Sequence, residues 1–490
     1  MTSLSTALSQ ALSGLRVSSG QSALVARNVS RATEEGYTRK YAGLATEFDG
    51  TARISSVNRN AEKRLADVLN SSITSSDGQK ILLDALERLQ QTVGDVQDDS
   101  SLAWGINELQ NKLRTLESNP SNQALAASAV STAAGLVSSL HAASDTIQSL
   151  RTDADTGIQN SVGNINTYLA QLQELNTRIV RTPTGDESLV ETLDARDRLL
   201  KSLSSEIGIR TVTQPNNGIA VYTAGGVTLF NETARQVTFQ ATAGLGPGSP
   251  GNSVYADGVA IVGPGAQMQP TQGKIAANAE IRDKLAPTYQ SQIDEIARGL
   301  IVLFAEKDVS ATPTLPDATG LFSYSGSPSV PGVATVIPGL ARSISLNAAF
   351  DPANGGNPFL LRDGGANGLA YKSNTTNAPS FQDRITALIS ALDSPMTFSA
   401  STGLPASASI KQLAQNSSGW VEGLRSEASQ RSDYLNALTA KAKEALSRAT
   451  GVNMDDEMAE MLKLERSYQA SAKVITIIDQ MFASLMAAVR

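Results

Sequence analysis

The segment from Asn453 to the end of the chain carries the pattern that most constrains the fold. Apolar side chains recur there at every seventh position, and a second set follows three residues after members of the first, which is the a and d pattern of a heptad. The two sets together are Met454, Met461, Leu464, Tyr468, Ile475, Ile478, Phe482, Leu485 and Val489. Asn453 can cap a helix, and the acidic residues directly after it favour a helix N-terminus. The segment is therefore predicted to be one long helix with a buried seam.

This helix needs a partner, because its seam alone cannot stabilise it. Burying nine such side chains yields roughly 15 to 20 kcal/mol, whereas fixing the backbone costs on the order of 40 kcal/mol before hydrogen bonds offset it. Residues 1–29 carry a stripe with the same period, rich in Ala and Ser. This stripe consists of Leu4, Leu8, Ala11, Leu15, Ser18, Ser22, Val25 and Val29. Both ends of the chain are thus predicted to be packing surfaces.

We predict that the assembly interface consists of the large apolar side chains of these two seams. They are Leu4, Leu8, Leu15, Val25, Met461, Leu464, Tyr468, Ile475, Ile478, Phe482, Leu485 and Val489.

The chain between about residues 60 and 205 shows three further helical seams. The apolar positions are Leu82, Leu86, Leu89, Val93 and Val96; Leu102, Ile106, Leu109, Leu113 and Leu116; and Ile158, Val162, Ile165, Leu169 and Leu172. Turn-forming residues predict breaks at Ser76–Gly78, around Pro120 and around Pro183. Long helices in a bundle are expected.

The remainder alternates between strand-like and helical stretches. Residues 209–273 contain alternating runs with a hairpin signal at Asn217-Gly218, and the run GLGPGSPG in it reads as a surface turn. Residues 274–308 return to a helical period, residues 309–400 are rich in Pro, Gly, Ser and Thr, and residues 410–449 are helical again. The second Pro- and Gly-rich stretch is predicted to be another β-rich insertion.

The predicted fold class is mainly α with β-rich insertions (α+β), in a nested multidomain arrangement. Residues 1–50 and 451–490 would form an inner domain of terminal helices. Residues 51–208 and 401–450, with the helix at 274–308, would form a helical bundle. Residues 209–273 and 309–400 would be β-rich outer regions.

Composition narrows the functional classes. The chain has no cysteine, so neither a disulfide framework nor a thiolate metal site is possible. Its single histidine, His141, lies in a helical stretch and reads as a packing residue. A net charge of −7 disfavours nucleic-acid binding. The sequence contains no run of about eighteen apolar residues, so no membrane span is predicted. The N-terminal residues lack the pattern of a cleaved signal peptide, so none is expected.

Four stretches of the sequence resemble those of a known family. Asn28, Val29, Ser30 and Ala32, followed by Gly36, Tyr37, Thr38 and Arg39, resemble the signature after the first helix of flagellar axial proteins, although Arg31, Glu34 and Glu35 depart from it. The C-terminal segment, with Tyr468, Gln469 and Ala470, is similar to the same proteins. The run from Leu193 to Leu200 resembles an internal motif of the hook-associated protein 1 family, and the helix from Ile281 resembles that family too.

This resemblance implies a structural role rather than an enzymatic one. It implies a junction layer between the flagellar hook and filament, built by helical self-assembly of the terminal helices, with no cofactor and no metal. The implied partners are further copies of the chain, the hook protein, a second junction protein, a cytoplasmic chaperone on the C-terminal helix and the flagellar type III export apparatus. The implied location is extracellular, after export without a cleaved signal.

Two alternatives remain open at this point. One is another axial protein, a hook or distal-rod subunit, which would have mostly strands between its terminal helices. The other is an enzyme or metal-binding adhesin carried in the insertions, since Asp153, Asp155 and the pair Asp98-Asp99 could ligate calcium. Caps and turns are the expected use of these acids. The charges from Asp194 to Arg198 are expected to form a solvated helix face.

Overall fold

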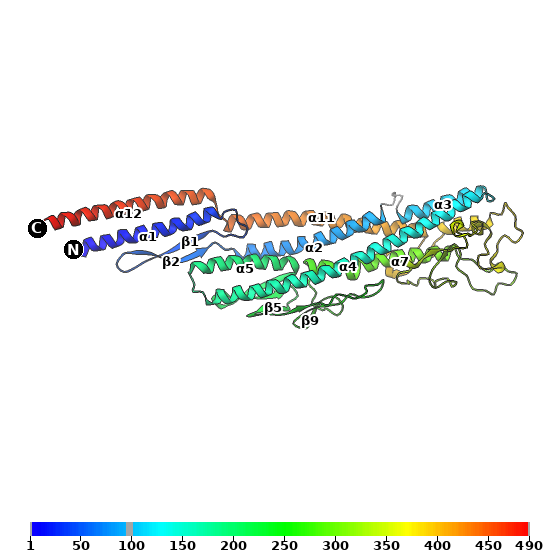
Figure 1. Cartoon of the computed structure of the whole chain (residues 1–490), viewed down its shortest axis with the longest axis horizontal. Helices are drawn as coiled ribbons and strands as arrows, with labels where there is room; N and C mark the ends of the chain where they lie inside the picture. The colour runs from blue at the N-terminus through cyan, green and yellow to red at the C-terminus, as the bar shows by residue number, and fades with distance from the viewer. Residues whose placement is uncertain (1, 95–100, 489–490) are drawn as a thin grey trace.

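The computed structural model describes residues 2–94 and 101–488 and has the shape of a long, narrow rod (Figure 1). Both termini lie at one tip of the rod, and the irregular segment around residues 310–400 lies at the other. The chain therefore runs the length of the molecule and returns, which places the first and last helices side by side, as the two matching seams predicted.

The inner tip consists of two helices and a hairpin. Helix α1 spans Thr2–Ser30 and helix α12 spans Met454–Ala488. Strands β1 (Lys40–Thr46) and β2 (Ala52–Arg59) form an antiparallel hairpin. In Figure 1, α12 follows one side of α1 and the hairpin follows the other. Leu24 of α1 is buried in a small apolar cluster with Val57 of β2 and Val190.

The central part of the rod is a bundle of long helices. They are α2 (Lys63–Val93), α3 (Leu102–Ser118), α4 (Gln123–Arg181), α5 (Glu187–Glu206), α6 (Lys274–Glu280), α7 (Ala286–Leu303) and α11 (Ile410–Thr450). Ser101, Asn122 and Asp186 cap the starts of α3, α4 and α5 through side-chain acceptors. A π-helical turn, Ile281–Leu285, joins α6 to α7, so the predicted helix at 274–308 has three parts.

The predicted seams form the cores of this bundle. All five positions from Leu102 to Leu116 are buried, as are all five from Ile158 to Leu172. Leu86 and Leu89 are buried as well, whereas Val96 lies outside the described residues. Nε2 of His141 donates to the carbonyl oxygen of Ile344 at 2.7 Å and links α4 to the end of a short helix, which agrees with a packing role.

The predicted break at Ser76–Gly78 is wrong, because α2 continues through it. Gly78 is there for close packing: a Cβ atom at this position would lie 3.0 Å from the carbonyl oxygen of Gly273. Glycine often marks a close approach of two backbones as well as a turn, and the local sequence does not distinguish the two uses. The breaks predicted around Pro120 and Pro183 are confirmed.

Residues 209–273 form two small antiparallel sheets beside the bundle. The first sheet has the order β3 (Ile209–Thr213), β4 (Ile219–Thr223), β5 (Thr228–Asn231), β6 (Thr233–Ala234). The second has the order β7 (Val237–Thr238), β8 (Val254–Ala256), β9 (Val259–Val262). The hairpin predicted at Asn217-Gly218 is confirmed: Ile209 pairs with Thr223, and Asn216 and Asn217 both have positive φ.

Two buried arginines attach the loop around residues 246–252 to the bundle. Arg151 of α4 donates to the carbonyl oxygens of Gly246 and Ser249. Arg282 donates to the carbonyl oxygen of Asn252 at 2.8 Å and to the carboxylate of Asp155 at 2.7 Å. The predicted surface turn in this loop is thus fixed by charge-assisted hydrogen bonds from Arg151 and Arg282 of the bundle.

Residues 309–400 were predicted to be β-rich, and this prediction is wrong. The region contains single turns and short helices, and its strands are two residues long. They are β10 (Phe322–Ser323) with β11 (Ser345–Leu346), and β12 (Met396–Thr397) with β13 (Ser407–Ala408). The helices are α8 (Leu340–Ser343), α9 (Leu360–Asp363) and α10 (Asp383–Asp393), with 3₁₀ turns at Pro352–Asn354, Leu369–Tyr371 and Ala400–Thr402.

Backbone hydrogen bonds within turns, supplemented by buried side chains, take the place of strand ladders in this region. The buried carboxylate of Glu306 accepts bonds from the backbone nitrogens of Ala366 and Asn367 at 3.1 and 3.0 Å. Frequent Gly and Pro prevent long strands, so isolated carboxylates take over as acceptors. Short apolar runs in a sequence do not show which groups will accept the backbone hydrogen bonds.

Two helical stretches of the described chain are long and apolar enough to cross a membrane by length and composition. One lies within α4, where 39% of the apolar window is buried, and the other within Ile410–Ala487, where 6% is buried. Core helices pass the same test, so this is weak evidence, and the absence of a membrane span stays a prediction. The second stretch includes α12, which carries several exposed apolar side chains.

Asp294 of α7 gives the fold a testable pH dependence. Its buried carboxylate accepts bonds from the backbone nitrogens of Gly339 and Ala341, both at 2.8 Å, and no cation bonds to it. Burial raises the pKa of Asp294 from 3.8 to about 6. The folded state therefore holds this proton more tightly than the unfolded state, so the associated stability is present below pH 4 and is lost as the pH rises through 6.

We expect Asp294→Asn to remove this dependence, because the amide keeps an acceptor oxygen and does not titrate. The free energy of unfolding of the variant relative to the wild type should rise by roughly 3 kcal/mol between pH 4 and pH 7. Urea unfolding at several pH values measures it. Asp145→Asn, at an exposed position, serves as the control. Parallel curves for wild type and Asp294→Asn would contradict the assignment.

Candidate assembly interface

Helices α1 and α12 pack against each other in antiparallel directions at the inner tip. The hydroxyl of Ser18 donates to the hydroxyl oxygen of Ser467 at 3.3 Å. One turn earlier on α1, a Cβ atom on Gly14 would lie 3.2 Å from Oγ of Ser471. Small residues on both helices therefore permit a close approach.

The predicted positions of α1 follow the face of Ser18 at helical spacing. Val25 is buried, and Leu4, Leu8 and Leu15 are partly buried. The contact surface that α1 offers is nevertheless small, because Ala and Ser occupy the positions between these side chains.

The predicted positions of α12 divide into two groups. Leu464 and Ile478 are buried, and Met461, Ile475 and Phe482 are partly buried, as a seam against α1 requires. Tyr468 and Leu485 remain 43% and 44% exposed and do not join this seam. Val489 lies outside the described residues. The assembly role of the full set stays a prediction.

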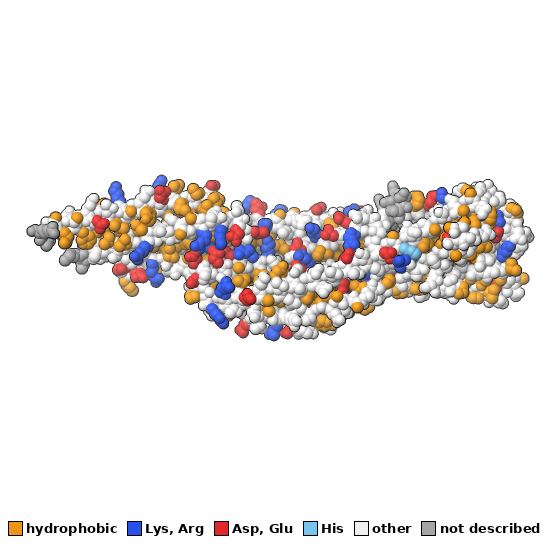
Figure 2. All heavy atoms as spheres, viewed as in Figure 1, with side chains coloured by type: hydrophobic (Ala, Val, Ile, Leu, Met, Phe, Trp, Pro, Cys, Tyr) orange, Lys and Arg blue, Asp and Glu red, His pale blue; other side chains and the backbone are white. Residues whose placement is uncertain are grey.

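A second apolar stripe on α12 faces solvent. We call it the outer ridge, and it consists of Met454, Met458, Leu462, Val474, Ile477, Met481 and Leu485. Most of its members are four residues apart, the spacing of a side-chain ridge that packs into the groove of a facing helix. Figure 2 shows apolar side chains gathered over the terminal helices. Burying the exposed part of each would stabilise a contact by roughly 1 kcal/mol per residue.

The joint at the base of the inner tip is a network of buried polar side chains, and Asn28 in the last turn of α1 is its first member. The buried amide nitrogen of Asn28 donates to the carbonyl oxygen of Lys40 at 2.8 Å and to the carboxylate of Glu457 at 3.0 Å. Its amide oxygen accepts from the Tyr37 hydroxyl at 3.0 Å and the Lys40 backbone nitrogen at 3.1 Å. An asparagine side chain offers both donors and acceptors, so one residue links α1, β1 and α12.

Glu457 is the second node of this joint. It lies in the first turn of α12, where the helix dipole favours a negative charge, and it is fully buried. Nε of Arg39 donates to its carboxylate at 2.5 Å. The predicted cap is confirmed as well, because Asn453 accepts a bond from the backbone nitrogen of Asp455 at 3.0 Å.

Asp194 of α5 is the third node, and here the prediction of a solvated helix face is wrong. Asp194 is 1% exposed. Its carboxylate accepts from the buried ammonium of Lys40 at 2.9 Å, from Arg59 at 2.8 Å and from the Thr38 hydroxyl at 2.7 Å. Asp197 does lie at the surface and shares Arg59 at 2.8 Å. Asp194 of α5 therefore binds the β1–β2 hairpin instead of being solvated.

Peripheral contacts complete the joint. The ammonium of Lys40 lies 3.6 Å from the centre of the Tyr37 ring, and burial raises the pKa of Tyr37 to about 12. Hydrogen bonds from Lys201 and Lys443 lower the pKa of Glu35 to about 2. The loop between α1 and β1, residues 31–39, is therefore attached to α5, α11 and α12 together.

The other acidic candidates are engaged in ion pairs. Asp153 and Asp155 lie inside α4, not at caps or turns as predicted, and bond to Arg88 and Arg282 at 2.8 and 2.7 Å. Asp98-Asp99 lies outside the described residues. Within the described ranges, no group of three or more His, Asp or Glu side chains is placed to hold a metal ion.

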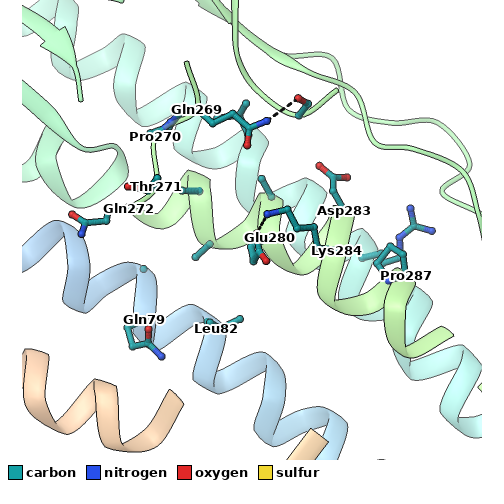
Figure 3. A pocket seen from close by; sticks show the side chains of 18 of the residues that line it. Gln79, Leu82, Gln269, Pro270, Thr271, Gln272, Glu280, Asp283, Lys284 and Pro287 are labelled. Atoms are coloured by element: carbon teal, nitrogen blue, oxygen red, sulfur yellow. Dashed lines mark hydrogen bonds and ion pairs between the residues drawn. The ribbon is translucent and has the colours of Figure 1, made fainter. Parts of the chain in front are cut away.

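An open cleft of about 690 Å³ lies between α2, α6, α7 and the loop at 262–273 (Figure 3). Three of the charged side chains on its wall are in ion pairs: Asp283 bonds to Arg282 at 2.8 Å, and Lys284 bonds to Glu280 at 2.8 Å. These bonds hold the π-helical turn in place.

A signal for the buried Asp194 is present in the sequence. Val190 and Asp194 are four residues apart, so a charged residue falls on the apolar face of a helix. Such a position predicts a buried carboxylate with cationic partners. The partners, Lys40 and Arg59, are more than 130 residues away in sequence, and no local pattern connects them.

We expect Asp194→Ala to loosen the joint, because Lys40 and Arg59 would be left buried with one counter-charge fewer. Removing one partner of a buried ion pair costs on the order of 3 to 5 kcal/mol. Urea unfolding and trypsin cleavage between residues 31 and 63 measure the effect. Asp197→Ala removes an exposed carboxylate from the same arginine and should cost under about 1 kcal/mol. Equal losses in the two variants would contradict the role of Asp194.

Comparisons with known proteins agree with this geometry. The model of the flagellar hook-associated protein FlgK helical domain matches residues 86–307, and the model of the flagellar basal body rod FlgEFG protein C-terminal region matches residues 446–488. The first match covers the end of α2, the helices from α3 to α7 and the small sheets. The second covers α12 and the end of α11.

Curated relatives carry one name. Flagellar hook-associated protein 1 of Salmonella typhimurium is 26% identical over 246 residues, which are 48% of this chain and 44% of that protein. The chain thus spans less than half the length of that relative in the match. The Bacillus subtilis protein of the same name is 21% identical over 98% of this chain and 97% of its own length.

A solved structure shares the fold. The flagellar hook junction protein FlgK from Burkholderia pseudomallei superposes with a TM-score of 0.58 at 15% identity, covering 77% of this chain and 99% of that chain. The matched domain, the matched C-terminal helix and the shared architecture lead to one conclusion: this chain is similar to the flagellar hook-associated protein FlgK, a structural protein of the flagellum.

Proposed function

We propose that this chain is a structural subunit of the bacterial flagellum and forms the junction layer between hook and filament. The terminal helices of neighbouring copies would pack together in a helical array, and the bundle and outer regions would lie further out. The observation that carries this proposal is the outer ridge of α12. It leaves a row of large apolar side chains exposed on a helix whose other face already packs on α1.

The proposed mechanism is mechanical. The inner tip supplies the contacts between copies, and the joint around Asn28, Glu457 and Asp194 fixes the direction in which α1 and α12 leave the bundle. A defined direction matters because a helical array repeats one orientation many times, and a small angular error accumulates. No chemical step, cofactor or metal is part of this function.

The proposed partners follow from the same surface and from the family. They are further copies of this chain, the hook protein below, a second hook-associated junction protein above, and the flagellar type III export apparatus. A cytoplasmic chaperone would cover the outer ridge before export, because an exposed apolar helix is liable to aggregate. The proposed location is the extracellular flagellum, reached without a cleaved signal peptide.

Another axial protein, a hook or distal-rod subunit, is the nearest competing reading. The long helices between the termini, α2 to α5, argue for the junction protein, since mostly strands would be expected otherwise.

The proposal is tested by deleting the gene in the bacterium that encodes this chain. We expect hooks without filaments and unassembled flagellin in the medium, with both defects reversed by the wild-type gene. Normal filaments in the deletion strain would contradict the proposal. Absence of the hook itself would favour a rod or hook subunit instead.

We expect Ile477→Glu to abolish assembly and leave the folded subunit unchanged. Ile477 belongs to the outer ridge and is exposed in the subunit, so a carboxylate there costs nothing until a neighbour covers it. Filament counts at matched secretion and thermal unfolding of the purified variant measure the two effects. Thr476→Glu, which places the same carboxylate at an exposed position of α12 outside the ridge, is the control. Normal motility with Ile477→Glu would show that the outer ridge remains exposed to solvent in the assembled layer.

A further inference from the structure

The tip of the β1–β2 hairpin presents a fully exposed aromatic ring. Phe48 has an exposed fraction of 114%, so none of the residues that the structure describes covers it. The turn that carries Phe48 is well fixed: the hydroxyl and backbone nitrogen of Thr51 donate to the Asp49 carboxylate at 2.6 and 2.9 Å. An exposed ring on a fixed turn suits a binding anchor, because little conformational entropy is lost when it docks.

Two side chains of helix α1 form hydrogen bonds with this turn. The side-chain amide of Gln10 donates to the carbonyl oxygen of Asp49 at 3.2 Å, and Ser13 accepts from the backbone nitrogen of Ala52 at 3.3 Å. Phe48 is therefore placed by the same helix that packs on α12. The position of the ring relative to α12 is set by α1.

The outer ridge and Phe48 belong to different sides of the inner tip. Figure 1 shows α12 along one side of α1 and the hairpin along the other. A surface pair of this kind is not self-complementary, so it favours a head-to-tail contact between copies over a two-fold dimer. Repetition of a head-to-tail contact gives a ring or a helical array.

The register places Phe48 at the height of a specific part of the ridge. Gly14 lies against Ser471, and Gln10 is about one turn further toward the N-terminus of α1. Because the helices are antiparallel, Gln10 and the bound hairpin tip lie level with the turn of α12 that follows Ser471. That turn begins the section of the ridge formed by Val474, Ile477 and Met481.

Charge supports the same pairing. At the hairpin tip Glu47 pairs with Arg53 at 2.9 Å, whereas the carboxylate of Asp49 bonds to the neutral Thr51 and keeps its charge; Lys473 lies beside this section of the ridge with an exposed side chain. Opposite charges around an apolar contact steer it into one orientation.

We propose that Phe48 of one copy docks on Val474, Ile477 and Met481 of the next copy around the layer. This inference rests on the proposed function and identifies its lateral contact. The occupant of both surfaces is a second copy of this chain.

The test places a photo-crosslinker at the tip while keeping an aromatic ring there. Phe48 is replaced by p-benzoylphenylalanine in a mixture of unlabelled and ¹⁵N-labelled subunits assembled on hooks, which are then irradiated. Mass spectrometry should find crosslinked peptides of mixed isotope composition that join residue 48 to residues 474–481. The same replacement at Val333, exposed in the region at the opposite end of the rod, is the control and should give no crosslink to α12.

A second variant measures the contribution of the ring. Phe48→Ala should lower the number of filament-bearing cells about tenfold or more, the change that loss of about 1.4 kcal/mol per contact produces, while monomer unfolding stays unchanged. Assembled layers whose crosslinks from residue 48 go elsewhere, or to another protein, would overturn the inference and leave the proposed function standing. Wild-type subunits that never enter a layer would overturn both.

Discussion

The contact between α1 and α12 is too small for the apolar surface that α12 carries. Where the helices approach, Gly14 and Ser18 face Ser471 and Ser467, so short side chains determine the distance between the helices. Two faces of α12 are apolar, and α1 covers one of them. We propose that the helices gain their remaining burial from neighbouring copies, so that assembly completes the fold of the inner tip.

The joint makes this arrangement directional. Asn28, Glu457 and Asp194 are buried polar groups, and each is bonded to segments that are distant in sequence. Buried ion pairs contribute little net stability, because desolvation opposes their attraction. They do penalise every geometry in which a charge loses its partner. We infer that the network fixes the angle between the inner tip and the bundle, which a less specific apolar contact would leave variable.

Regular periodicity made much of the fold predictable. The seams at Leu102–Leu116 and Ile158–Leu172 repeat the helical period over several turns, and the matching stripes at the two ends predicted that α1 and α12 would be partners. The errors have physical causes. Gly78 serves a close approach inside a helix instead of a turn, and carboxylates such as Glu306 replace the strand ladders expected in residues 309–400.

The interface was predictable in part. The heptad identified Leu464 and Ile478 of the inner seam, but a single seven-residue repeat does not show that α12 has a second apolar face. The ridge has a four-residue spacing and winds around the helix relative to the heptad. The joint was missed for another reason: Lys40, Arg59 and Asp194 meet through tertiary structure, and the charge pattern of α5 alone equally describes an exposed helix.

Amide hydrogen exchange on α12, in the free subunit and in the assembled layer, tests the central claim most directly. If neighbours supply the missing burial, amides from Tyr468 to Phe482 should exchange within seconds in a verified monomer and become protected after assembly, while amides of α3 and α4 stay protected in both states. Protection of Tyr468 to Phe482 in the monomer equal to that of α4 would contradict the account, because the terminal helices would then be a stable intramolecular pair.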